Sequence, residues 1–536
     1  MIRRTGAQTW RNIHVTTEAR LADLIDIDNA SPNGARPTGF ELLKQAARDL
    51  DGIVQDARRQ GRRVRALGSG WALTDIAVTD GWLINTKRLN ACFDVSDGYF
   101  ETTYPEEKRR LVVVAQCGIS VGELNTHLEV TATPGFPRAL KTSGIGAGQT
   151  IAGAISGNTH GSAINFGATP DFVVGLHIVT GSGQSVWIER ASHPVFNEAF
   201  VGKLEAERIR DDDVFAAAVV SFGAFGVIAA VAIETDDIYQ LNFPEVKDIA
   251  HADLKAKLND FAAHAPAELY HYEFIFDPYG KRQLAMEASA PKVPFIPGLP
   301  APQPVWIVRD RDGYAPGDTL APLALATGDR ATPMFLGLRF VPPRWRTAVQ
   351  FELYRQRAIL GNVRSTPGQL FTATVTYFEG YTESAVGVSL RDAATMMEVS
   401  TEVIQHMGLP SISQVRVVGS SKALLGFTSL EPKTAVFEFG LANDERARRF
   451  EDTLIAALTA RGVAYTLHWS KNSGIDRQRL YAMYGSERVA KWCRARRRVF
   501  KNDTSLMKLF DNDHVARAGL AGECEPSLTE FGRLGA

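Results

Sequence analysis

Glycine is concentrated in three segments of the chain, and this constrains the fold more than any other feature. The segments are 64–77, "VRALGSGWALTDIA", 142–189, which contains "TSGIGAGQTIAGAISGNTHGSA", and 219–235, which contains "SFGAFGV". So many glycines beside strand-like runs indicate that the main chain closely approaches either other backbone or a ligand. Three such segments separated by strands predict one extended ligand held between two small sheets.

The first glycine segment follows a predicted helix and a predicted strand. Residues 38–61 carry apolar residues every three or four positions, with Thr38 and Glu41 at capping-box spacing and Gly61 suited to a left-handed helix end. A Rossmann site needs a strand, then G-x-G-x-x-G, then a helix, whereas here the glycines stop at Gly70 and another strand is expected. Two interpretations of the loop stay open: a nest of backbone N–H groups that holds a diphosphate, or a plain tight turn.

Composition limits the classes of function. The 536 residues predict two or three lobes, and the formal net charge of −1 with 22% charged residues favours neither nucleic acid nor a membrane surface as a partner. The basic residues Arg494, Arg496, Arg497, Arg498 and Lys501 are interpreted as a solvated helix face. The four cysteines show neither metal-ligand spacing nor a disulfide framework, no metal site is expected, and no signal peptide or apolar span is visible. A cytoplasmic location is the expectation.

Four motifs in the same order resemble the vanillyl-alcohol-oxidase superfamily, which has a PCMH-type FAD-binding lobe, and most closely its alditol and aldonolactone oxidase branch. This chain reads "GSGWA" at 68–72, "SGNTHGSA" at 156–163, "SFGAFGV" at 221–227 and "HWSK" at 468–471, where the branch reads "GSGHS", "TGTHGSG", "SLGALGV" and "HWGK". The resemblance spans roughly residues 38–240 and 410–515. It implies an α+β fold: a two-subdomain FAD-binding lobe and a cap domain whose antiparallel sheet is flanked by helices.

The resemblance also implies which positions contact FAD. They are Leu67, Gly68, Ser69, Gly70, Trp71, Ala72, Gly144, Gly148, Thr150, Gly153, Ser156, Thr159, His160, Gly161, Gly226, Val227 and Ile228.

Trp71 departs from the pattern of the branch. The histidine of "GSGHS" usually bonds covalently to the flavin, and an indole cannot form that bond. We therefore expect noncovalent FAD, with Trp71 packed beside the flavin edge. Cys117 is interpreted as a buried structural thiol rather than a substitute anchor.

Candidate catalytic residues come from two strands of the expected cap and from "HWSK". Gln414 and Arg416 share one face of the strand in 411–421, and they stand where the branch has a glutamate and an arginine. Glu438, in the strand at 434–440, replaces a histidine, and Lys471 matches a lysine.

We assign roles to these residues from the chemistry of alcohol oxidation. Lys471 would stabilise charge that develops on the flavin, and Arg416 would orient the substrate or hold an alkoxide. Glu438 is a candidate base with a pKa raised by its apolar neighbours, and the alternative is a salt bridge to Arg416. For Gln414 a structural hydrogen bond is favoured over catalysis. His468 is interpreted as a supporting or core histidine.

The predicted function is an FAD-dependent oxidoreductase that oxidises a CH–OH group of a small molecule by hydride transfer. Two alternatives stay open: a flavin-binding or ligand-binding protein without turnover, and an oxidase of a non-carbohydrate alcohol or an amine. Gly144 would leave room for dioxygen, and the choice between dioxygen and another electron acceptor stays open, as do the substrate and the oligomeric state.

The expected organisation is an FAD lobe at 1–238, a cap at 239–467 and a segment at 468–536 that returns to the FAD lobe. Two segments are expected to be loops because they are rich in proline, glycine or asparagine: 26–39, "DIDNASPNGARPTG", and 290–306, "APKVPFIPGLPAPQPVW".

Overall fold

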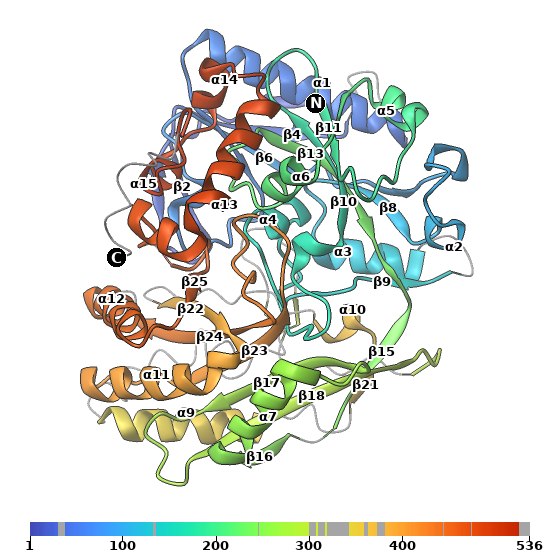
Figure 1. The fold of residues 1–536 in the computed structure, drawn as a ribbon. Coiled ribbons are helices and arrows are strands. Elements are labelled where there is room, and N and C mark those ends of the chain that lie inside the picture. The colour runs from blue at the N-terminus through green and yellow to red at the C-terminus, as the bar shows by residue number, and fades with distance from the viewer. Residues whose placement is uncertain are drawn as a thin grey trace.

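The computed structural model describes residues 1–30, 38–131, 136–244, 246–299, 307–308, 317–318, 342–357, 363–371, 381–442, 444–472 and 474–524. Two sheets lie in the N-terminal half of the chain and a third, larger sheet lies beyond them, so that the molecule has an upper and a lower part in Figure 1. Mixed sheets above and an antiparallel sheet with helices below confirm the predicted α+β class.

The upper part is built on a four-stranded and a six-stranded sheet. In order across the sheet, the first consists of β1 (Ile2–Arg4), β4 (Asp23–Asp28), β6 (Trp82–Arg88) and β5 (Val64–Leu67). The second consists of β12 (Glu207–Arg210), β11 (Val186–Glu189), β10 (Val173–Val179), β13 (Val227–Glu234), β8 (Val112–Gln116) and β7 (Cys92–Asp94). Short ribbons pair β2 (Thr9–Arg11) with β3 (Glu18–Arg20) and β9 (Arg138–Ala139) with β14 (Asp236–Asp237).

Helices and helical turns accompany these sheets. The helices are α1 (Phe40–Arg59), α2 (Glu106–Arg109), α3 (Val121–Thr126), α4 (Ile151–Ser156), α5 (Glu198–Leu204) and α6 (Asp212–Ala218). Shorter turns are η1 (Asp75–Ala77), η2 (Asp97–Tyr99), η3 (His127–Thr131), η4 (Thr169–Phe172) and, in the lower part, η5 (Leu390–Asp392).

Helix α1 confirms the predicted amphipathic segment, and it buries Leu43, Leu50 and Val54. The predicted capping box is wrong, because the N-cap is Gly39 and no side chain caps the helix. The helix therefore begins one residue too late for the Thr38 hydroxyl to reach its free N–H groups. Gly61 has φ +61°, as expected for a left-handed residue after a helix.

The lower part is a nine-stranded antiparallel sheet. Its strands, in spatial order, are β21 (Val363–Ser365), β15 (Tyr239–Phe243), β18 (Leu284–Pro294), β17 (Leu269–Phe276), β23 (Ser413–Gly419), β24 (Lys433–Ala442), β22 (Tyr381–Ser389) and β25 (Tyr465–Leu467), with β16 (Lys247–Ala250) also paired to β18. Its helices are α7 (His251–His264), α9 (Pro343–Arg357), α10 (Pro367–Leu370), α11 (Ala393–Met407) and α12 (Glu445–Ala460). A separate ribbon pairs β19 (Ile307–Val308) with β20 (Gly317–Asp318).

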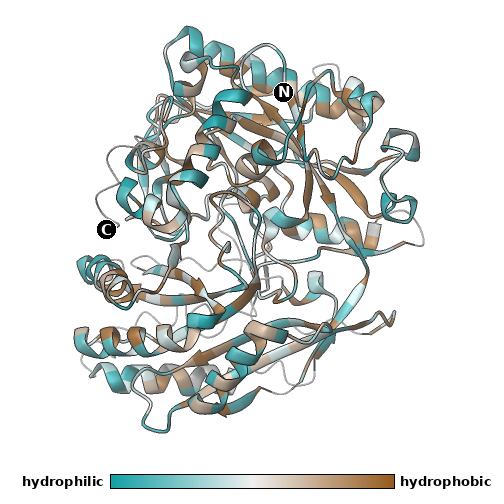
Figure 2. Ribbon diagram, in the orientation of Figure 1, coloured by the Kyte–Doolittle hydropathy of each residue, from teal (hydrophilic) through white to brown (hydrophobic). Residues whose placement is uncertain are grey.

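Apart from the short α10, which contacts α3, the helices leave one face of this sheet for the upper part of the molecule (Figure 1). Figure 1 shows α9 and α11 below the strands, on the side away from the upper part. Hydrophobic residues concentrate on the strands, and hydrophilic residues on the outer faces of the helices (Figure 2).

Two expected loops contain strands. Pro291 pairs with Leu269 and Pro294 with Tyr239 inside β18, so the loop expected at 290–306 is wrong for its first residues. The register shifts beside Pro291, and a proline is tolerated at such a bulge because its nitrogen need not donate there. Residues 26–28 are likewise the end of β4, where alternate side chains are buried. The other residues of both segments lie partly outside the described ranges.

The chain leaves the lower sheet at Leu467 and runs back along the upper part. It forms α13 (Arg477–Val499), α14 (Thr504–Leu509) and α15 (Asp513–Arg517). Trp492 of α13 packs against Phe222 and Phe225, which lie in the third glycine segment. Among the helices of the described ranges, none combines the length and the apolar character needed to cross a bilayer.

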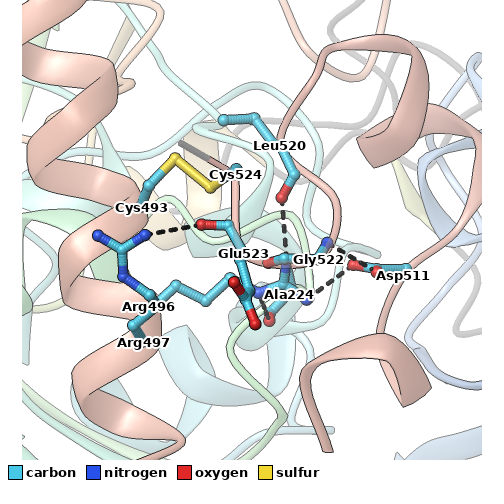
Figure 3. Close-up of a disulfide and its surroundings, with 9 residues drawn as sticks. All are labelled: Ala224, Cys493, Arg496, Arg497, Asp511, Leu520, Gly522, Glu523 and Cys524. Atoms are coloured by element: carbon cyan, nitrogen blue, oxygen red, sulfur yellow. Dashed lines mark hydrogen bonds and ion pairs between the residues drawn. A yellow bond between two sulfur atoms is a disulfide. The ribbon is translucent and has the colours of Figure 1, made fainter. Parts of the chain in front are cut away.

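Two expectations about this C-terminal region are wrong (Figure 3). Cys493 and Cys524 form a disulfide across 31 residues, which the spacing of the cysteines did not indicate. Arg496 does not belong to a solvated face: it is fully buried and donates to four carbonyl oxygens and to Asp511. The acceptors lie in segments distant in sequence, because α14 and the third glycine segment converge on this side of α13.

Replacement of Arg496 tests how strongly it holds the C-terminal helices to the upper part. The variant Arg496→Met should lower the free energy of unfolding by about 3–5 kcal/mol, because it removes the cationic partner of the largely buried Asp511 side chain and the donor to the carbonyl oxygens. Urea unfolding followed by tryptophan fluorescence measures the difference. Arg494→Met, on the exposed side of the same helix, is the control and should change stability by less than about 0.5 kcal/mol. Equal losses of unfolding free energy in the two variants would contradict the role of Arg496 in holding the C-terminal helices.

Candidate functional site

A cavity of about 390 Å³ lies between the glycine segments and the lower sheet. All the positions proposed for FAD line it except Gly148, Gly161 and Val227. Of the proposed catalytic residues, Gln414, Arg416 and Lys471 line the cavity, whereas Glu438 lies behind them. The structure thus brings the three glycine segments, β22, β23 and the turn at 468–471 to one cavity, of the size typical of a ligand site.

Backbone amides of the first glycine segment are available to a ligand. In the described part of the chain, the N–H groups of residues 69–72 donate no hydrogen bond to another protein group, and these residues line the cavity. The segment is fixed just beyond this point, where Leu73 N donates to Ser470 O at 2.8 Å and the Thr74 hydroxyl to Trp469 O at 3.0 Å. Consecutive free amides that face a cavity form an anion-binding nest, which fits the diphosphate of FAD.

Trp71 packs against the second glycine segment. A Cβ atom at Gly146 or Gly148 would lie 2.4 or 2.5 Å from the indole ring. Glycine at these positions is therefore explained by the approach of the Trp71 side chain, and not by a ligand alone. The indole forms part of the cavity wall.

The cap side of the cavity carries a row of alternating charges. Along the row lie Glu273 of β17, Arg416 of β23, Glu438 of β24, Lys471 and Glu383 of β22. Arg416 Nη2 lies 3.0 Å from Glu438 Oε2, and Lys471 Nζ lies 3.0 Å from Glu383 Oε2. Lys471 also pairs with Glu438 Oε1. Gln414 Nε2 donates to Glu273 Oε2 at 3.3 Å, which is the structural hydrogen bond favoured for it.

The expected raised pKa of Glu438 is wrong. Burial by itself would raise it, but the Arg416 guanidinium and the Lys471 ammonium hold the pKa of this carboxyl well below its usual range. The apolar neighbours Phe437 and Phe439 do not set the pKa of Glu438, because successive side chains of a strand point to opposite faces. The alternative interpretation, a salt bridge to Arg416, is the observed one.

Three histidines border the cavity as neutral groups. Burial lowers the pKa of His14 and that of His160 to about 4, and it lowers the pKa of His468 well below the ordinary value. His468 Nδ1 accepts a hydrogen bond from Ser470 N at 3.1 Å, which shapes the turn that carries Lys471. The supporting role expected for His468 agrees with this contact.

Cys117 is almost fully buried, as expected, although it also lines the cavity. Burial raises the pKa of its thiol to about 12, so it is present as the thiol and not as the nucleophilic thiolate.

Several lining residues escaped the sequence analysis. Glu383 is the clearest, since it is the one acidic side chain among the described residues of the lining. Its strand, "YTESAVGVS", is buried without interruption from Ser384 to Val388, so no alternation marked Glu383 as a carboxylate that faces the cavity. His14 comes from the turn between β2 and β3, and the sequence offers no signal there either.

Comparisons with known proteins agree with this geometry. Residues 44–189 match the family model described as "FAD binding domain". The D-arabinono-1,4-lactone oxidase of Eremothecium gossypii is 30% identical over 190 residues, which cover 35% of this chain and 30% of that protein. The L-gulonolactone oxidase of Bos taurus is 27% identical over 249 residues, 46% of each chain. The chain therefore matches less than half the length of these relatives.

Solved structures show the same fold over nearly the whole chain. The cholesterol oxidase from B. sterolicum has a TM-score of 0.66 at 14% identity, with 97% of each chain covered. A chitooligosaccharide oxidase has a TM-score of 0.57 at 14% identity, with 96% of each chain covered. The comparisons thus show that residues 44–189 match an FAD-binding domain and that nearly the whole chain has the fold of these two oxidases.

Proposed function

We propose that the protein is an FAD-dependent oxidoreductase that oxidises a CH–OH group of a small molecule, with FAD bound noncovalently. The observation that carries the proposal is the continuity of one cavity. Free amides of residues 69–72 border it at one side, and the side chains of Arg416 and Lys471 border it at the other. A diphosphate-binding nest and a pair of cations in one enclosed space suit a nucleotide cofactor and a reacting substrate together.

The cofactor would be held by main chain from the three glycine segments. The amides of residues 69–72 would bind the diphosphate, and the backbone around Gly144, Gly153 and Gly226 would surround the remainder. When bound, FAD supplies the acceptor for the hydride that leaves the substrate carbon.

Arg416 and Lys471 would act through their charge. Burial lowers the pKa of Lys471, but Glu383 and Glu438 more than compensate, so its pKa is raised and it stays protonated. Its ammonium would stabilise negative charge that accumulates during reduction, and the Arg416 guanidinium would orient the substrate oxygen. Both cations are already held by carboxylates before the substrate arrives, and this limits reorganisation during the reaction.

The substrate is proposed to be a hydroxylated small molecule, as the lactones and sterol in the names of related proteins suggest. We do not expect this protein to have the polyol specificity of the branch, because Gln414 and Glu438 replace the glutamate and histidine implied by the resemblance. A larger or less polar alcohol, or an amine, is the alternative. Dioxygen or another acceptor would reoxidise the cofactor.

Anaerobic mixing tests the proposed activity. The purified holoprotein should lose its flavin absorbance when L-gulono-1,4-lactone, D-arabinono-1,4-lactone, cholesterol, a chitooligosaccharide or an aromatic alcohol is added, and the effective compound identifies the substrate class. Retained absorbance with all of them, together with tight FAD binding, would favour a binding protein without turnover.

Acid precipitation tests the noncovalent attachment. The yellow colour should move into the supernatant, because the indole of Trp71 cannot be alkylated by the flavin and the Cys117 thiol is protonated. Absorbance of pellet and supernatant is the measurement. Colour that stays with the denatured protein would overturn noncovalent binding.

Replacement of Lys471 tests the electrostatic role. Lys471→Met should slow reduction of the flavin by substrate on the order of 100-fold, because the charge that develops then lacks a positive partner. Stopped-flow absorbance measures the rate, and a fluorescence titration of the apoprotein shows whether FAD affinity is kept. An unchanged reduction rate would remove Lys471 from the mechanism.

A further inference from the structure

Glu383 differs from the other carboxylates around the two cations by its access to the cavity. The side chain of Glu383 is 23% exposed and lines the cavity, whereas that of Glu438 is 2% exposed and lies behind Arg416 and Lys471. Glu273 stands at the far end of the row, accepts a hydrogen bond from Gln414 and does not line the cavity. Of these three carboxylates, Glu383 is the one that lines the cavity.

We propose that Glu383 is the catalytic base that accepts the hydroxyl proton of the substrate. This inference rests on the proposed function. It adds a catalytic residue that lies outside the sequence motifs from which the other candidates were chosen.

The ion pairs show why Glu383, and not Glu438, can take a proton. Both oxygens of Glu438 face a cation, Oε1 with Lys471 and Oε2 with Arg416. A proton on Glu438 would leave two largely buried cations with less compensating charge, which is costly in a low-dielectric site. Among the residues that the structure describes, Glu383 pairs only through Oε2, with Lys471, and Lys471 keeps Glu438 as a partner when Glu383 becomes neutral.

The strand holds Glu383 firmly in place. β22 lies between β24 and β25, and Glu383 is opposite Gly440 of β24. Because glycine has no side chain, this neighbour leaves the carboxylate unobstructed on that side. Lys471 reaches the same spot from the turn after β25, so that base and cation share one wall of the cavity.

The proton balance of the step is simple. The O–H bond of the substrate breaks and its proton passes to a carboxylate oxygen of Glu383, which becomes a neutral carboxylic acid. The C–H bond breaks with its electron pair leaving as hydride for the flavin cofactor, and the carbon–oxygen double bond forms. Solvent later removes the proton from Glu383.

The surroundings of Glu383 predict the pH dependence of the step. Burial and the negative charge of Glu438 raise the pKa of Glu383, and the positive charges of Lys471 and Arg416 lower it in part. The net shift is upward, so the base gains its proton at a higher pH than an ordinary glutamate. The rate of flavin reduction should therefore rise with pH through a pKa above that of an ordinary glutamate and reach a plateau.

The experiment compares the holoprotein with Glu383→Gln and Glu398→Gln. Glu398 pairs with Lys255 on the surface of the lower part, so its variant applies the same substitution to an ion pair far from the cavity. At the plateau pH, Glu383→Gln should reduce its flavin about 100-fold to 10,000-fold more slowly and lose the pH-dependent limb. Glu398→Gln should keep both. The probe is whichever of the compounds named above reduces the wild-type flavin fastest, in anaerobic stopped flow.

Infrared difference spectra supply a readout without turnover. A protonated carboxyl band that titrates in the wild-type protein should be missing from Glu383→Gln, and a fluorescence titration should show unchanged FAD affinity. A slow Glu383→Gln variant that keeps the pH limb would show that Glu383 only positions Lys471, and this overturns the proposal. An unchanged rate overturns it as well. A wild-type flavin that no compound reduces would instead overturn the proposed function.

Discussion

The double ion pair of Glu438 is the interaction on which the rest of the site depends. Arg416 comes from β23 and Lys471 from the turn after β25, and the buried carboxylate between them holds both cations at the cavity wall. Each partly buried ion alone would carry a desolvation cost of several kcal/mol, which opposite charges in close contact offset. The lower sheet therefore presents charge to the cavity only because β23, β24 and β22 are adjacent.

The turn at 468–471 connects this charge to the cofactor side. Ser470 O accepts the amide of Leu73 and Trp469 O accepts the hydroxyl of Thr74, so the turn is bound to the end of the first glycine segment. Trp469 also packs against Phe222 of the third segment, with the two rings tilted and their centroids 4.0 Å apart. One short stretch of chain thus fixes the distance between the free amides and Lys471. A shift of the upper part relative to the lower sheet would therefore change the position of the free amides and that of Lys471 together.

Sequence patterns predicted the features that depend on residues close together in the sequence. The amphipathic period gave α1, two-residue alternation gave β23 and β24, and the glycine motifs gave most of the cavity lining. They missed features that depend on which segments meet. Arg496 finds its carbonyl partners only when α14 and the third glycine segment converge on α13, and Cys493 meets Cys524 only after the chain turns back. The same holds for Glu383, whose role depends on Lys471 from another element.

The two departures from the branch, Gln414 and Glu438, face each other in the lower sheet. These residues are directly opposite each other in the pairing of β23 with β24, so their side chains lie on the same face of the sheet. Where the resemblance implies a glutamate on the first strand and a histidine on the second, this chain has a neutral amide and a carboxylate. The carboxylate of this facing pair is therefore on β24 in this chain, opposite the position on β23 where the resemblance implies a glutamate. In its new position it lies between two cations, where it is stable as an anion and unsuited to accept a proton. The proposed proton acceptor, Glu383, lies instead on β22, the strand beyond β24.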